Sequence, residues 1–176
     1  MCTIFAHPAV PIVAAVCLPR GVATPWLIAA GILCSIIPDA DAIGFSFGVP
    51  YGSMFGHRGI THSIAFAAVL AAVLAFSFFR GSPEGVAVPL LYLFLATLSH
   101  PMLDMLTNGG SGVALVAPFT GERYFFPWRP IEVSPIGFSF FSPRGWMVIE
   151  SELWWVWLPA AAVFSTVYFA RRVAAV

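Results

Sequence analysis

Two histidines flank an arginine in the segment Gly56-His57-Arg58-Gly59-Ile60-Thr61-His62-Ser63, and the whole chain has only four histidines. Imidazole is the commonest side-chain ligand for divalent metals, and guanidinium recognises phosphate. The run that follows, residues 64–79, has no charged side chain and predicts a helix that enters a bilayer. Ionisable groups at the mouth of such a helix are costly, so we interpret this segment as part of a functional site.

The other candidate residues lie at the ends of other apolar runs. His100 and Asp104 are four residues apart and share one helix face, and Pro101 between them is compatible with a helix start or a kink. Asp39 and Asp41 follow Pro38 in an expected turn, where two carboxylates can converge on one cation.

His57 and His62 are five residues apart, so we expect His57 in the loop and His62 on the first helical turn. With alternating crossings and His7 opening the first segment, every histidine and aspartate falls at one face of the membrane. We therefore expect a metal or proton site built from His7, Asp39, Asp41, His57, His62, His100 and Asp104.

Mixed imidazole and carboxylate ligands suit Zn²⁺, Mn²⁺ or Fe²⁺, with zinc first, better than Ca²⁺. One or two ions fit the set, and in a two-ion site a carboxylate such as Asp41 or Asp104 would form the bridge. Arg58 would neutralise a phosphate, so Arg58 and Asp41 are the expected catalytic residues. The three cysteines are widely spaced and indicate no metal or redox motif.

Composition sets the class of protein. The chain has 176 residues, of which 60% are hydrophobic and 9% charged, and a mean hydropathy of +0.91. A soluble surface needs about 25–35% charged residues, so this is a multi-pass membrane protein. The net charge is zero, which gives no indication of a nucleic-acid partner.

The apolar runs predict an all-α polytopic membrane helix bundle of about four to five transmembrane segments, forming a single domain over residues 1–176. The expected segments are residues 1–19, which are short and rich in proline, then 22–37, 62–79, 86–107 and 153–170. Residues 42–56 are expected to form a connecting loop. Residues 108–152 predict a long aromatic-rich loop folded over the membrane face.

Arginine placement predicts the orientation. If Arg80 and the pair Arg171-Arg172 are cytoplasmic, Arg20 is cytoplasmic too, which satisfies the positive-inside rule. The candidate site and the long loop then lie at the extracytoplasmic face of the plasma membrane. No signal-peptide pattern precedes the first segment, so we expect it to remain in the mature protein.

These motifs also carry a resemblance. The blocks around His7, Pro38-Asp39-Ala40-Asp41, residues 57–63, residues 99–104 with 107–110, Phe125-Phe126-Pro127-Trp128 and Pro135-Ile136-Gly137 resemble the YdjM-like family. Members are bacterial and archaeal inner-membrane proteins described as metal-dependent hydrolases, some under LexA control. The resemblance covers nearly the whole chain and implies that His57, His62, His100, Asp104, Asp39 and Asp41 form the family's site.

Three functions remain open at this point. The first is a metal-dependent hydrolase that cleaves a phosphoester or ester bond of a lipid at the outer interface, with membrane lipids as environment and substrate. The second is a transporter that uses the same cluster for metal ions or protons. The third is a purely structural hydrogen-bonding network. The sequence does not choose the lipid, the metal or the oligomeric state.

Overall fold

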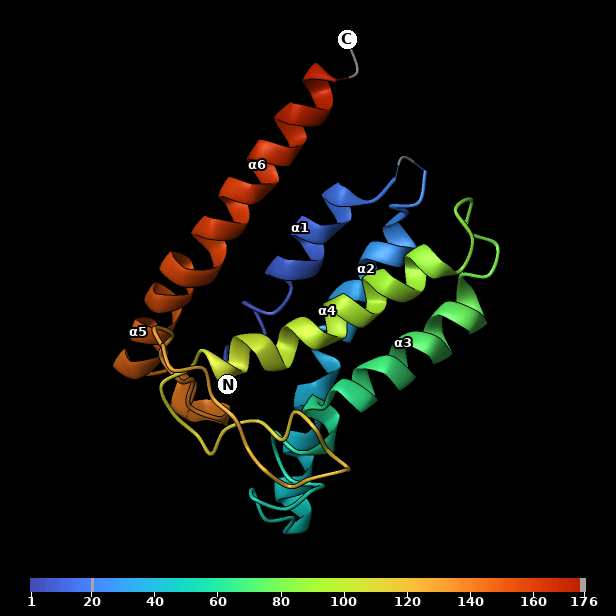
Figure 1. Ribbon diagram of the computed structural model, residues 1–176. Coiled ribbons are helices and arrows are strands. Elements are labelled where there is room, and N and C mark those ends of the chain that lie inside the picture. The colour runs from blue at the N-terminus through green and yellow to red at the C-terminus, as the bar shows by residue number, and fades with distance from the viewer. Residues whose placement is uncertain (20, 175–176) are drawn as a thin grey trace.

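All regular elements within the described residues, 1–19 and 21–174, are helical in the computed structural model (Figure 1). The expected all-α membrane helix bundle is therefore confirmed. The α-helices are α1 (Ala9–Cys17), α2 (Pro25–Cys34), α3 (Ile64–Phe78), α4 (Ala87–Met105), α5 (Pro143–Glu152) and α6 (Leu158–Val173). The 3-10 helices are η1 (Ile37–Phe47), η2 (Ile60–His62) and η3 (Gly137–Phe140), and the π-helical turn Leu153–Trp157 joins α5 to α6.

Within the part of the chain that the structure describes, three helical stretches are long and apolar enough to cross a membrane: Pro25–Phe47, Ala87–Met105 and Pro143–Val173. Helix α3 is apolar but has only 15 residues. At 1.5 Å per residue it is about 22 Å long, less than the ~30 Å hydrocarbon core. Helix α1 has nine residues, so the segments expected at residues 1–19 and 62–79 contain helices shorter than the hydrocarbon core.

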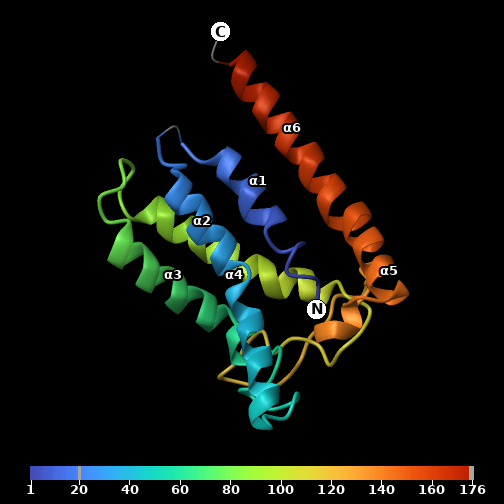
Figure 2. The ribbon, with the colours of Figure 1, turned by 180° about the vertical axis from the view of Figure 1, so that it is seen from behind.

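Helices α3 and α4 pack side by side, and small residues make this close approach possible (Figure 2). Ala67, Ala71 and Ala75 recur every four residues along α3 and are all buried. Helix α2 also packs closely on α4, because Gly31 lies against the ring of Tyr92. The Tyr92 hydroxyl in turn donates a hydrogen bond to the carbonyl of Pro11 in α1. Helix α4 is thus the central element of the bundle.

Capping residues fix where two helices begin. The Thr24 hydroxyl accepts a hydrogen bond from the amide of Leu27, and Pro25 occupies the first turn of α2. The Ser63 hydroxyl accepts one from Phe66, so α3 begins directly after His62. His62 therefore lies at the end of η2, just before the helix α3 on which we expected it.

Two segments expected to be loops are helical. Asp39 and Asp41 lie within η1, which extends over residues that the sequence assigned to a turn and a connecting loop. The segment expected as a loop to residue 152 contains α5, which continues through the π-helical turn into α6. The reason differs for the two segments. η1 is a 3-10 helix, which is common in connections, and α5 begins at Pro143, a residue favoured in the first turn of a helix.

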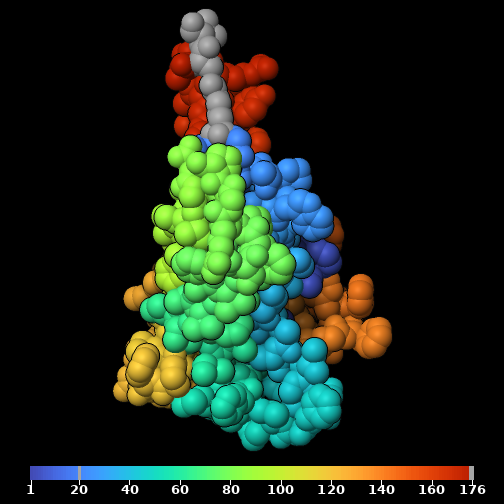
Figure 3. All heavy atoms as spheres, turned by 90° about the vertical axis from the view of Figure 1, so that its right-hand side faces the viewer, coloured from blue at the N-terminus to red at the C-terminus, as the bar shows by residue number. Residues whose placement is uncertain are grey.

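The two ends of the bundle differ in character (Figure 1). The α3–α4 connection and the end of α6 lie at one end, where Arg171 donates hydrogen bonds to the carbonyls of Cys17 and Leu18. The long connections between η1 and α3 and between α4 and α5 gather at the other end. The space-filling view shows these connecting segments, coloured teal and yellow-orange, covering that end (Figure 3).

Candidate metal centre

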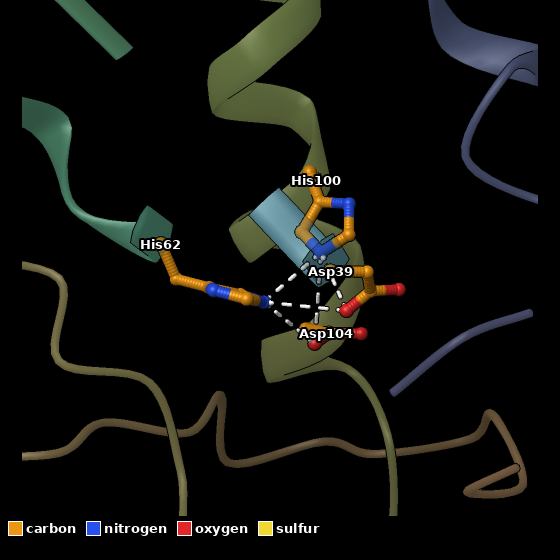
Figure 4. A group of neighbouring side chains, drawn as sticks. All are labelled: Asp39, His62, His100 and Asp104. Carbon is orange, nitrogen blue, oxygen red and sulfur yellow. Dashed lines mark hydrogen bonds and ion pairs between the residues drawn. The ribbon is translucent and has the colours of Figure 1, made fainter. Parts of the chain in front are cut away.

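Four side chains from three elements converge on one point (Figure 4). Because His62 ends η2 and Asp104 lies in the last turn of α4, this point is at the end of the bundle that carries the long connections. Asp39 comes from η1, His62 from η2, and His100 and Asp104 from α4. One ligand atom from each of the four lies within 4.8 Å of every other. His62, His100 and Asp104 are completely buried, whereas the side chain of Asp39 is 11% exposed. Asp39 is therefore the one residue of the four with exposed surface.

The distances between the donor atoms can be compared with a metal's coordination polyhedron. The Nε2 atoms of His62 and His100 are 3.0 Å apart. Asp39 Oδ1 lies 3.6 Å from the first and 3.3 Å from the second. Asp104 Oδ2 lies 3.6 Å and 4.0 Å from the same two atoms. Tetrahedral ligands at 2.0–2.2 Å from zinc are separated by about 3.3–3.6 Å, so these four donors fit such an ion.

Outer hydrogen bonds orient both imidazoles toward this group. Nδ1 of His100 lies 2.7 Å from the Ser35 carbonyl, which can only accept, so Nδ1 carries the proton. Nδ1 of His62 faces the Thr61 hydroxyl at 3.1 Å and Asp41 Oδ2 at 3.2 Å. Each Nε2 is thereby left with a free lone pair directed at the other. Two such lone pairs 3.0 Å apart repel each other unless a proton or a cation lies between them.

The orphaned atom of the group is Asp39 Oδ1, which is buried and has no hydrogen-bond partner among the described residues. Burying an unpaired carboxylate oxygen is expensive, and a cation removes that cost. Burial alone would lower the pKa of His62, but the neighbouring carboxylates of Asp39 and Asp41 outweigh burial and raise the pKa to about 9. The geometry therefore attracts positive charge, as a proton or as a metal ion.

Asp41 and His57 form a second group with His62, again with ligand atoms within 4.8 Å of each other. Asp41 Oδ1 lies 2.6 Å from Nδ1 of His57. Asp41 Oδ2 accepts hydrogen bonds from the Thr61 hydroxyl and the amide of Arg58. The two oxygens of Asp41 face His57, His62, Thr61 and the amide of Arg58 rather than the inner four-donor group, in contrast to the bridging role expected for Asp41. The arrangement is that of an outer carboxylate that positions a metal-binding histidine.

Arg58 is completely buried and does not face a substrate. Its Nε donates to Asp104 Oδ2 at 3.0 Å, and its two terminal nitrogens donate to the Gly109 carbonyl and the Thr107 hydroxyl. The guanidinium holds Asp104 in place and ties it to the connection after α4. This contact set does not favour the phosphate-binding role expected from the sequence.

His7 lies beside the four-donor group. Its ring stacks on that of His100, with centroids 3.7 Å apart. Its Nε2 is 3.9 Å from Asp39 Oδ2 and 3.9 Å from Asp104 Oδ1. Burial lowers the pKa of His7 to about 3, so the ring is neutral. All seven residues expected as metal ligands are thus within one buried cluster, although only four share the inner group.

Several residues that support the cluster were not identified from the sequence. Thr61, Ser35 and Thr107 bond to cluster side chains as described, and the amide of Cys2 donates to Asp104 Oδ1 at 2.8 Å. Arg123 donates to four backbone carbonyls, at His57, Gly112, Tyr51 and Ser53. It thereby fastens the aromatic-rich segment to the loop before η2. Thr61 and Thr107 both lie in the motif blocks that carry the family resemblance, which was the available signal for these two residues.

Comparisons with known proteins agree with this placement in a membrane. The family described as YdjM inner membrane protein matches residues 1–175. The inner membrane protein YbcI of Escherichia coli is 42% identical over 173 residues, which cover 98% of this chain and 100% of that protein. The inner membrane protein YdjM of Escherichia coli is 32% identical over 146 residues, covering 76% of this chain and 66% of that protein. No solved structure matches the chain.

Proposed function

The chain belongs to the YdjM family of inner membrane proteins, and we propose that its buried cluster of histidines and aspartates makes it a metal-dependent hydrolase of the membrane. The substrate we propose is a lipid, cleaved at a phosphoester or ester bond at the membrane surface. The observation that carries the proposal is the convergence of His62, His100, Asp39 and Asp104, with Asp39 Oδ1 unpaired.

The type of ligand supports a catalytic site. Structural zinc sites are closed and rich in cysteine, whereas catalytic sites use histidine and carboxylate and keep a position open. Four protein donors fill a tetrahedral shell, so a water or substrate oxygen would bind as a fifth ligand next to Asp39, the one inner residue with exposed surface. A divalent ion held by these residues supplies Lewis acidity, which polarises a phosphoryl or carbonyl oxygen and acidifies a water molecule.

The chain's own residues then position the reaction. Asp41 and Thr61 keep the proton of His62 on Nδ1, so that Nε2 remains a ligand. Arg58 and the amide of Cys2 hold the two oxygens of Asp104. Side chains held from outside in this way stay in place during turnover without reorganisation.

The surroundings favour a lipid substrate. The open side next to Asp39 belongs to η1, whose Ile37, Ile43 and Phe47 are exposed apolar side chains. In a membrane protein such side chains contact acyl chains or the interface. A lipid headgroup beside η1 would reach the centre without leaving the membrane surface.

The test is turnover of labelled lipid phosphoesters and carboxyl esters in detergent micelles. Asp39→Asn keeps the shape of a side chain whose Oδ1 makes no hydrogen bond, but weakens a ligand. We expect a loss of more than about 100-fold, beyond the 10- to 100-fold typical of outer-shell changes. Glu84→Gln, the same chemical change at an exposed residue of the α3–α4 connection, is the control and should retain full activity.

Transport of metal ions or protons is the second candidate, because fully buried ionisable residues in a membrane protein often mark an ion path. Carriers, however, place their sites near the midplane. This cluster lies where the long connections gather (Figure 1). Metal uptake into proteoliposomes without hydrolysis of any tested lipid ester would favour transport and overturn the hydrolase.

A further inference from the structure

We infer that His7 completes a second cation site, which shares Asp39 and Asp104 with the first. This inference rests on the proposed metal centre and adds to it. A two-ion centre would bind the two oxygens of a phosphoryl group at once, which makes phosphoesters the favoured substrate class.

The carboxylates of Asp39 and Asp104 each direct one oxygen toward His62 and His100 and the other oxygen toward His7. Asp39 Oδ1 and Asp104 Oδ2 face the Nε2 atoms of His62 and His100 at 3.3–4.0 Å. The opposite oxygens, Asp39 Oδ2 and Asp104 Oδ1, are each 3.9 Å from Nε2 of His7. Carboxylates that bridge in this manner hold two cations about 3.5–4 Å apart.

His7 supplies the observation that points independently to a ligand. It is completely buried, and neither ring nitrogen has a hydrogen-bond partner among the described residues. A buried imidazole without partners loses about 1–3 kcal/mol for each unsatisfied polar group, so a packing role alone explains it poorly. The stacking on His100 directs the ring edge toward the two carboxylates.

One contact competes with this site. The amide of Cys2 donates a hydrogen bond to Asp104 Oδ1 at 2.8 Å, which uses part of that oxygen's capacity. A carboxylate oxygen has two lone-pair directions and accepts a second partner in the other. The Cys2 amide therefore orients Asp104 Oδ1 and leaves one lone pair for a cation.

The charges of the cluster predict which of the two cation sites binds more strongly. Asp39, Asp41 and Asp104 carry three negative charges and Arg58 one positive charge, and the N-terminal ammonium near Asp104 is offset by the Glu152 carboxylate, so a single divalent ion balances the cluster. A second divalent ion adds two positive charges in a buried environment, which is costly unless an anion enters with it. The His7 site should therefore be the weaker one, and phosphate should strengthen it.

The experiment measures Mn²⁺ bound per chain in detergent, with and without inorganic phosphate, for wild type and His7→Phe. Phenylalanine keeps the ring that stacks on His100 and removes both nitrogens. We expect two ions per chain in wild type with phosphate and one in His7→Phe. Electron paramagnetic resonance of the wild type should show an exchange-coupled pair, and His7→Phe an isolated ion.

The alternative results of this metal-binding experiment lead to different conclusions. One uncoupled ion per chain in the wild type with phosphate overturns the second site and leaves the proposed centre intact, and this result needs no variant. Two ions in His7→Phe remove His7 from the site. No bound Mn²⁺ or Zn²⁺ in the wild type contradicts the proposed function itself.

Discussion

Asp41 contacts two histidines, one hydroxyl and one amide, yet lies outside the inner donor group. If it positions His62, Asp41→Asn should weaken metal binding without abolishing it, because the amide oxygen still accepts a hydrogen bond but carries no charge. The expected loss is about 10- to 100-fold in zinc affinity. Chelator competition measures it, with Glu84→Gln as control. Unchanged affinity would remove Asp41 from the support of the centre.

Arg58 should matter for stability first. Removing one partner of a buried ion pair costs about 3–5 kcal/mol, so Arg58→Ala should strongly lower the free energy of unfolding in detergent. Lysine should not restore it, because one ammonium cannot replace three nitrogens bonded in different directions. Arg144→Ala is the control: its partly exposed pair with Glu132 should contribute about 0–1 kcal/mol. Equal effects of the two alanine substitutions would contradict the structural role of Arg58.

The sequence predicted the residues of the cluster better than their roles. Every histidine and aspartate does lie in one cluster, because buried charge in an apolar protein needs partners. The position of Arg58 could not be predicted in this way. Its partners Thr107 and Gly109 lie about fifty residues away in a connection whose path is set by tertiary contacts.

Among the helices, the contact of α2 with α4 gives a direct test. A Cβ atom at Gly31 would lie 2.5 Å from the Tyr92 ring, too close for any side chain. Gly31→Ala should therefore separate the helices and lower stability by about 1–3 kcal/mol, as overpacked cores do. The control is Gly81→Ala, where a Cβ meets nothing within 4 Å. Thermal unfolding in detergent compares the two. A Gly31→Ala protein as stable as wild type would contradict this packing.

Element type followed from the sequence where apolar runs were long, as in α3 and α4. The type of element could not be predicted where polar residues interrupt the apolar pattern. Helix α5 contains Arg144, Glu150 and Glu152, which indicated a loop. Glu152 is nevertheless buried, because it accepts hydrogen bonds from the amide and hydroxyl of Thr3. Such a long-range pair has no local signature.

For the whole molecule, the remaining prediction is its orientation in the membrane. Arg80 and the pair Arg171-Arg172 belong to the end opposite the cluster, whereas Arg20, used in the same argument, lies outside the described residues. The positive-inside rule then places the cluster at the extracytoplasmic face. We therefore propose that the cluster faces the extracytoplasmic side.

Cysteine labelling tests it at two open positions, Gly121 in the aromatic-rich segment and Gly81 in the α3–α4 connection. Cys17 is the exposed native cysteine and is first replaced by alanine, while Cys2 and Cys34 are buried. A membrane-impermeant reagent should modify Gly121→Cys in intact cells and Gly81→Cys only after lysis. The reverse pattern would place the cluster in the cytoplasm and make cytoplasmic substrates the candidates.

The central claim is that His62, His100, Asp39 and Asp104 bind a metal ion. Elemental analysis combined with X-ray absorption at the metal edge tests it on the purified wild-type protein. The account predicts at least one transition-metal ion per chain, with nitrogen and oxygen ligands at about 2.0–2.2 Å, an imidazole signature and no sulfur. Metal at background level, or a sulfur-ligated ion, would contradict it.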